Sequence, residues 1–276
     1  MPRTRINANE KLARIRVNWR FGTMAVYLND APSTSVVNKR ERVVEELLSN
    51  APRFASGSTA RIVHAVLLIL AQALCVFVIG FRLAESILPA PQETIWDGSA
   101  PAFGLALLIA ALSLVAVLWL GLVRWGRVQW RDLGWTLEHL PQQLVRGVIG
   151  LGVAVLVLFG LLRFSGVTAS DFFQMLVGYT LPQRALFALI GVQAALVEES
   201  LFRGYLQPTF NARLGTVAGV VVTALVFAIY HLNFSPLGLA GKFFLGLIYG
   251  CLREQSQALA SPAFAHFGVW FVIGML

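Results

Sequence analysis

The sequence predicts an all-α fold: a polytopic membrane helix bundle of about seven spans, preceded by a basic extension. Two observations carry this prediction. The 276 residues are 57% hydrophobic and only 13% charged, whereas soluble domains carry about 25% charged residues. Apolar runs of about 20 residues also recur, which is the length a helix needs to cross a hydrocarbon core. A membrane β-barrel would need short strands of alternating polarity.

The apolar runs divide the chain into three regions. We expect a basic extension over 1–61, N-terminal membrane helices over 62–183, and a C-terminal core over 184–276 that holds the most deeply placed polar side chains. The sixth span is short and contains Lys242, which we expect to snorkel or to contact lipid headgroups. The expected spans are 62–82, 101–123, 144–163, 184–208, 213–233, 236–252 and 258–276.

The distribution of charge predicts the orientation of the chain. The net charge is +8, and 11 of the 22 Lys and Arg residues lie before the first span. The charged residues of the loop 88–102 are all acidic, whereas the next loop, 124–135, carries three arginines. Alternate loops share the basic bias, so we expect a multi-pass protein of the plasma (inner) membrane with a cytosolic N-terminus that contacts anionic lipid. This pattern argues against nucleic acid as a partner.

Three charges interrupt the fourth span, in the stretch "EESLFR". Glu199 and Arg203 are four residues apart, which places them on one helix face where they can pair. Glu198 lies about 100° around the helix and lacks Arg203 as an obvious partner. An ionisable side chain inside a membrane indicates a functional site, so Glu198 is the residue to explain.

Two histidines complete the constellation, because His231 lies in the fifth span and His266 in the seventh. A carboxylate in an apolar pocket can accept a proton from water, and imidazoles can share that task or donate to an oxyanion. Alternatively, Glu198, His231 and His266 could ligate one zinc ion, which takes three protein ligands in catalytic sites. A metal-free glutamate mechanism is equally compatible with these residues.

The three motifs together have a known counterpart. "EESLFR", then "FAIYH", then "SPAFAH" resemble the CAAX-protease and bacteriocin-processing (CPBP) family of intramembrane proteases, also called the CAAX prenyl protease 2/lysostaphin resistance protein A-like family. The resemblance covers about residues 184–276. It implies that this region is a catalytic core and that the protein is an intramembrane endopeptidase, acting on a membrane-anchored or prenylated (CAAX-type) protein or peptide.

The resemblance also implies roles for individual residues. Glu198 would activate water with help from His231, and His266 would stabilise the oxyanion. Glu199 and Arg203 would organise the site, with Phe227 and Trp270 as supporting residues. The family places Asn or Asp four residues after the last histidine, where this chain has Trp270. Indole has one N–H donor and no acceptor. A catalytically inactive scaffold of the same fold, or a proton-coupled transporter, therefore remains as an alternative.

With straight helices, Glu198 and His231 are expected at different depths in the membrane. His231 is about 27 Å along its helix from the end near Arg213, at 1.5 Å per residue. Glu198 is only about 15 Å from Pro208 by the same count. Tilt, a kink or a longer interfacial segment would then have to bring Glu198 and His231 together.

Overall fold

The computed structural model describes residues 16–19, 22–25, 52–87 and 98–273. The chain divides into two compact units, Met1–Ala51 and Pro52–Leu276. In the first, strands β1 (Arg16–Trp19) and β2 (Gly22–Ala25) pair antiparallel. Most of the expected basic extension and the acidic residues of the loop at 88–97 lie outside the described residues.

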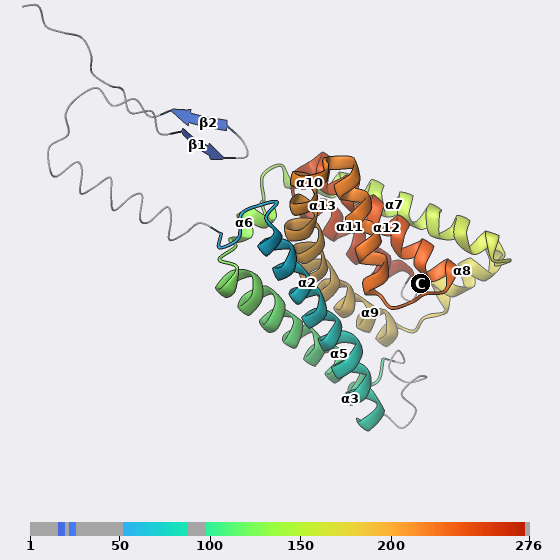
Figure 1. The fold of residues 1–276 in the computed structure, drawn as a ribbon. Coiled ribbons are helices and arrows are strands. Elements are labelled where there is room, and N and C mark those ends of the chain that lie inside the picture. Colours follow the sequence, from blue (N-terminus) through green and yellow to red (C-terminus); the bar gives the residue numbers. More distant parts are fainter. Residues whose placement is uncertain (1–15, 20–21, 26–51, 88–97, 274–276) are drawn as a thin grey trace, which may run out of the picture. The chain divides into compact units, whose positions relative to one another are not determined.

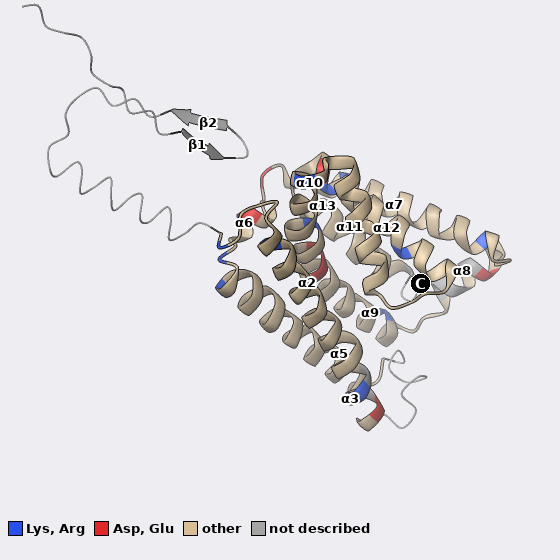
Figure 2. Cartoon of the chain, viewed as in Figure 1, with Lys and Arg blue, Asp and Glu red and all other residues tan. Residues whose placement is uncertain are grey.

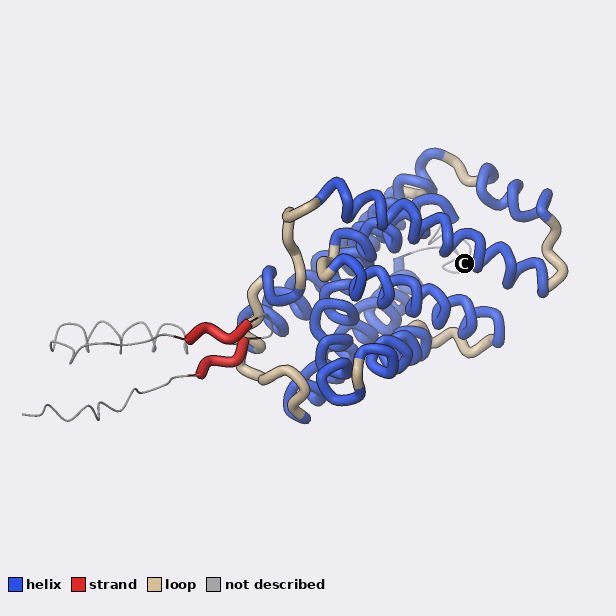
Figure 3. The backbone as a smooth tube through the Cα atoms, turned by 90° about the horizontal axis from the view of Figure 1, so that it is seen from above, coloured by secondary structure: helices blue, strands red, loops and turns tan. Residues whose placement is uncertain are grey.

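The second unit is all-α in its described part, as predicted, and Figures 1 and 3 show its helices packed side by side. Three of its segments, labelled η, are π-helical. The elements are α2 (Thr59–Ala73), η1 (Leu74–Ile79), α3 (Gly80–Ile87), α5 (Ala100–Ser113), η2 (Leu114–Trp125), α6 (Trp130–Leu133), α7 (Leu140–Phe164), α8 (Ala169–Gly178), α9 (Leu181–Gln193), η3 (Ala194–Leu206), α10 (Gln207–Leu214), α11 (Thr216–Tyr230), α12 (Pro236–Ser256) and α13 (Ala260–Ile273).

Helices cover most of the described part of the seven expected spans. Among the described residues, four helical segments are long and apolar enough to cross a membrane: Thr59–Ile79, Ala100–Trp125, Leu140–Phe164 and Leu181–Leu214. α11 is apolar but shorter. α12 carries Lys242, Arg253 and Glu254, and α13 has only 14 residues. Figure 2 shows long helix surfaces with few charges. These helices indicate an integral membrane protein.

Polar caps mark where several of these helices begin. The Ser58 side chain accepts a hydrogen bond from the Arg61 backbone N–H at the start of α2, and Ser99 does the same for Ala102 in α5. Thr180 and Gln183 form a capping box at the start of α9. Such caps satisfy backbone donors that the first helical turn leaves free. The starts of these helices can therefore be recognised from the sequence more easily than the way the helices pack against one another.

Helix α13 packs against α7, α9, η3 and α12, and α11 packs against α10 and α12. The α11–α12 contact depends on small residues. A Cβ atom at Gly246 would lie 2.9 Å from the Cα atom of Ala224, and one at Gly250 would lie 2.9 Å from the Val220 side chain. Glycine at both positions allows the two backbones to approach closely. This close approach brings α11 and α12 against the π-helical segment η3.

The candidate active site

The segment η3 lies at the centre of the bundle. Glu199 and Arg203 are fully buried, and Glu198 is 7% exposed. The segment is π-helical over its whole length. Hydrogen bonds in a π-helix join residues five apart, and such segments are frequent at functional sites. Burying an ionised group without a partner is costly, so each of the three has to be explained by its own contacts.

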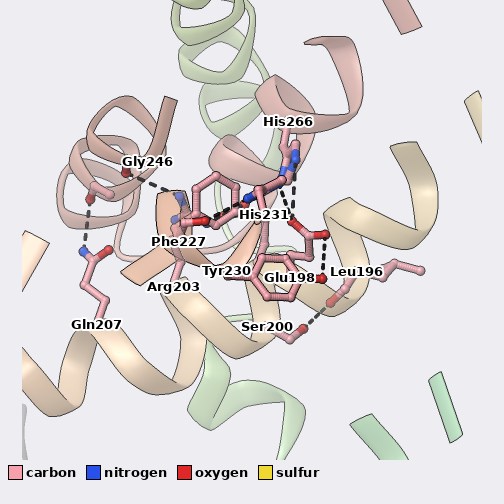
Figure 4. A network of polar contacts seen from close by, with 12 residues as sticks. Leu196, Glu198, Ser200, Arg203, Gln207, Phe227, Tyr230, His231, Gly246 and His266 are labelled. Carbon is pink, nitrogen blue, oxygen red and sulfur yellow. Dashed lines mark hydrogen bonds and ion pairs between the residues drawn. The ribbon is translucent and has the colours of Figure 1, made fainter. Parts of the chain in front are cut away.

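Glu199 and Arg203 form the ion pair that their spacing predicts. The distance from Arg203 Nη1 to Glu199 Oε1 is 3.1 Å, and neither side chain is exposed. Arg203 Nη2 also donates to the Gly246 carbonyl on α12, at 3.4 Å (Figure 4). The guanidinium lies 4.2 Å from the centroid of the Phe227 ring. Arg203 therefore links η3 to both α11 and α12.

His266 on α13 lies between the two glutamates. Its Nδ1 atom is 2.8 Å from Glu199 Oε1, and its Nε2 atom is 4.0 Å from Glu198 Oε2. An ionised Glu199 is an acceptor only, so His266 Nδ1–H is the donor in this contact. The ring also stacks on Tyr249, with centroids 4.8 Å apart. The contact with Glu199 fixes the ring so that its other nitrogen points at Glu198, a link that the sequence did not reveal.

Glu198 has looser contacts than Glu199. The Tyr230 hydroxyl donates to Oε1 at 3.5 Å, and His231 Nε2 is 4.0 Å from Oε2 (Figure 4). Among the described residues, Oε2 has no hydrogen-bond partner. Separations of 4.0 Å exceed a direct hydrogen bond, but a water molecule can bridge them. Glu198 is thus surrounded by groups that do not bind it tightly.

His231 follows the last residue of α11, and its ring is also held in place. Its Nδ1 atom is 2.8 Å from the Phe227 carbonyl oxygen. A carbonyl only accepts, so Nδ1 carries the proton and Nε2 of the neutral ring is an acceptor that faces Glu198. The Phe227 ring lies 4.6 Å from the His231 ring and 5.8 Å from the His266 ring, centroid to centroid. Phe227 therefore packs between the two histidines.

The mismatch in depth between Glu198 and His231 is not found. The helix that carries Glu198 does not end at Pro208 but continues through α10 to Leu214. Gly215, at φ +81°, makes the turn into α11. It is 17 residues after Glu198 and 16 before His231, so both residues lie at about the same distance from the turn. The straight-helix expectation was wrong because it placed the turn at Pro208.

Comparison with known protein families bears on this part of the chain. Residues 180–272 match the model of the family described as Rce1-like, type II CAAX prenyl endopeptidase. The resemblance seen in the sequence is confirmed over this Rce1-like region. No curated protein and no solved structure was found to match the chain. The region runs from the start of α9 to the end of α13 and contains all three motifs.

The Rce1-like region opens onto a cavity of about 250 Å³. Glu198 and His231 line it, together with Trp270, and its remaining walls are mainly aliphatic side chains of η1, α5 and α9. Trp270 lies one helical turn beyond His266, where its Cβ atom packs close to Gly191. The aromatic ring therefore forms part of the cavity wall, at the position where the family pattern has Asn or Asp.

Sequence reasoning did not place three polar residues in this cavity, Gln193, Tyr230 and Lys242. Lys242, which we expected to snorkel or to contact lipid headgroups, lines the cavity, and its Nζ atom lies 5.8 Å from the centroid of the Trp270 ring. The available signal was the position of Lys242 inside the sixth span. A charged residue there indicates that α12 does not face lipid alone. Tyr230 adjoins His231 in the sequence, yet nothing in that position predicts a bond to Glu198.

The three residues that could ligate zinc, Glu198, His231 and His266, do not have tetrahedral zinc spacing as they are placed. Glu198 Oε2 is 4.0 Å from Nε2 of both His231 and His266. Zinc ligand atoms lie about 2.0–2.2 Å from the metal in tetrahedral geometry, so they approach one another more closely than this. Within the described ranges, no group of three His, Cys, Asp or Glu side chains has the spacing to hold a metal ion.

Proposed function

We propose that this protein is an intramembrane endopeptidase that hydrolyses a peptide bond in a membrane-anchored or prenylated, CAAX-type protein or peptide. One observation carries the proposal above others: the buried Glu198 carboxylate faces a cavity, with two histidine Nε2 atoms 4.0 Å from its Oε2 atom. The match of residues 180–272 to a family of prenyl endopeptidases supports the same reaction class.

Glu198 is the general base of the proposed reaction. Its Oε2 atom accepts a proton from a water molecule, while His231 Nε2 accepts a hydrogen bond from the same water and orients it. The water oxygen then bonds to the carbonyl carbon of the scissile peptide. The electron pair of the carbonyl double bond moves to its oxygen and forms a tetrahedral oxyanion.

His266 stabilises that oxyanion in this scheme. In its imidazolium form both ring nitrogens donate; Nδ1–H is bound by Glu199, and Nε2–H is directed into the site. A donor placed where charge develops lowers the barrier to amide hydrolysis. When the intermediate collapses, the C–N bond breaks and the proton held by Glu198 passes to the leaving nitrogen.

The walls of the cavity support a lipid-modified or strongly apolar substrate. Leu105, Ile109 and Leu186 line it together with other aliphatic side chains. Binding an apolar chain there would remove the chain and the aliphatic walls from water or lipid headgroups, and it would exclude bulk water from the site. Exclusion of water strengthens every electrostatic contact that the mechanism uses.

The test compares the purified wild type with Glu198→Gln on prenylated CAAX-type peptides and on membrane-anchored peptides, with products identified by mass spectrometry. Glu138→Gln is the matched control, because Glu138 is exposed in the loop before α7. We expect cleavage by the wild type and the control and none by Glu198→Gln. Equal cleavage by all three proteins would contradict the role of Glu198.

Trp270 favours one second candidate, a catalytically inactive membrane scaffold. An indole at this position brings a single N–H donor and cannot replace the acceptor of Asn or Asp. A scaffold would retain the fold and bind apolar peptides, but the wild type would cleave none of the substrates. The proton-coupled transporter and the contact of the N-terminal extension with anionic lipid remain predictions from the sequence.

A further inference from the structure

One polar residue of the cavity wall has no role in the proposed mechanism. Gln193 is the last residue of α9 and lines the cavity together with Glu198 and Trp270. It is 7% exposed, and among the described residues its amide nitrogen has no hydrogen-bond partner. A buried amide has given up its hydrogen bonds to water, so leaving its N–H groups unpaired costs stability. An unpaired donor in a cavity wall therefore indicates a ligand that pairs with it.

The π-helix explains why Gln193 lines the same cavity as Glu198. The two residues are five apart. In an α-helix this separation would turn Glu198 by about 140° from Gln193, at 100° per residue. Segment η3 begins directly after Gln193, and hydrogen bonds in a π-helix join residues five apart. Gln193 therefore lies about one turn before Glu198, and both side chains line the cavity.

The chemistry of the cavity wall indicates what Gln193 can bind. Of the described residues that line the cavity, Gln193 alone carries a carboxamide, and most of the others are apolar. In the proposed reaction Glu198 and His231 act on the water, and Tyr230 donates to Glu198. On α13, Trp270 supplies an N–H donor only, where the family pattern has Asn or Asp. A carboxamide both donates and accepts, which matches the backbone N–H and carbonyl groups of a peptide.

We propose that the Gln193 carboxamide binds the backbone of one extended substrate residue next to the scissile bond. This inference rests on the proposed function and deepens it. Nε2 donates to the carbonyl oxygen of that residue and Oε1 accepts from its N–H, as paired residues do in an antiparallel sheet. One helical turn separates Gln193 from Glu198, roughly 5 Å, and an extended chain rises about 3.3–3.6 Å per residue. The bound residue is therefore within two positions of the cleaved bond.

Stability separates an amide that binds a ligand from one that holds the fold. Gln143 is the contrast, because it is also buried but its amide nitrogen donates to the Glu138 and Thr136 carbonyls. Gln143→Met loses these bonds and should melt about 2–4 °C below the wild type. Gln193→Met removes an unpaired donor instead, so it should melt at or above the wild-type temperature.

The main test replaces the backbone N–H groups of a prenylated CAAX-type peptide by ester oxygens, one at a time, and leaves the cleaved bond intact. Wild type and Gln193→Met are compared with Gln142→Met, at an exposed glutamine in the first turn of α7. We expect one ester near the cleaved bond to lower kcat/KM of the wild type and of Gln142→Met by about two- to tenfold, as the loss of one hydrogen bond implies. Gln193→Met should cleave this ester and the parent peptide equally well, both at the reduced rate.

A binding measurement keeps this inference separate from catalysis. Fluorescence anisotropy of the labelled parent peptide and its esters is measured with Glu198→Gln and with Glu198→Gln/Gln193→Met. We expect one ester to bind the first variant about two- to tenfold more weakly than the parent peptide does, and to bind the second as well as the parent. If the wild type cleaves nothing but this difference is found, the proposed function fails and the role of Gln193 stands.

Two results would overturn the role of Gln193. The first is that no ester has a penalty that Gln193→Met abolishes, either in cleavage or in binding. The second is that Gln193→Met melts as far below the wild type as Gln143→Met, which would make its amide part of the packing. Either result leaves the endopeptidase itself in place if the wild type cleaves the parent peptide and Glu198→Gln does not.

Discussion

Glu198 and Glu199 are consecutive in η3, but they face different parts of the molecule. The packed face comprises Glu199, Arg203 and their partners, with charged contacts of 2.8 and 3.1 Å to Glu199 and no exposure of Glu199 or Arg203. The cavity face comprises Glu198, Tyr230 and His231, and its contacts to Glu198 are 3.5 and 4.0 Å. His266 contacts both glutamates, and Phe227 contacts both Arg203 and His231.

The difference in contact distances between the two faces shows how one buried segment can stabilise the fold and also supply a reactive group. Charges that are mutually satisfied at short range hold helices together, because removing either partner leaves an unpaired charge in a low-dielectric interior. A carboxylate with long contacts is free to accept a proton and to bind a substrate. The two faces should therefore respond to mutation in different observables, stability on one side and turnover on the other.

The largest effect should follow from Arg203→Met on the packed face. The change leaves Glu199 buried without its cation, which costs about 3–5 kcal/mol in the free energy of unfolding. Thermal unfolding of the protein in detergent measures it. The double variant Glu199→Gln/Arg203→Met should recover part of the loss, because neither charge remains. A single variant as stable as the wild type would contradict the structural role of the pair.

His231→Gln should affect the cavity face, with a loss of activity instead of stability. Removing an imidazole that orients the attacking water should lower kcat/KM by about a hundredfold or more. The melting temperature should change less than in Arg203→Met, since His231 Nε2 is 4.0 Å from Glu198 Oε2 and no short ion pair with Glu198 is lost. His139→Gln, at an exposed histidine before α7, is the control. Equal kcat/KM values for His231→Gln and His139→Gln would contradict a role of His231 in orienting the water.

Gly246→Ala should destabilise the packed face by about 1–3 kcal/mol through overpacking. The new Cβ atom would lie 2.9 Å from the Ala224 backbone, and the Gly246 carbonyl also accepts from Arg203. Gly152→Ala is the matched control on α7, where no atom lies within 4 Å of the added Cβ. Unfolding of both variants by heat distinguishes them, and equal melting temperatures would argue against close packing of α11 and α12.

Tyr230→Phe should have the smallest effect. The hydrogen bond to Glu198 is long, at 3.5 Å, so its loss should lower kcat/KM by only about two- to tenfold. Tyr179→Phe, on the loop after α8, provides the comparison. A loss of kcat/KM as large as that of His231→Gln would mean that Tyr230 takes part in the reaction. A change in the melting temperature alone would mean that Tyr230 has a structural role, like the residues of the packed face.

The sequence predicted the helices and the Glu199–Arg203 pair because both depend on local spacing. It also predicted that Glu198, His231 and His266 belong together, and the structure brings them within 4.0 Å. The contact between His266 and Glu199 could not be foreseen, since it depends on the rotation of α13 against η3. Likewise, the passage of the helix through Pro208 depends on the change from π- to α-helical geometry at Gln207. Local propensity does not encode such a change.

The separation of the two faces is tested most directly by measuring turnover and unfolding of Glu198→Gln and Glu199→Gln side by side. We predict that Glu198→Gln melts like the wild type and cleaves nothing. Glu199→Gln should melt at a lower temperature, because Arg203 is left buried without its anion. The opposite pattern, with an unstable Glu198→Gln that retains turnover, would contradict the account.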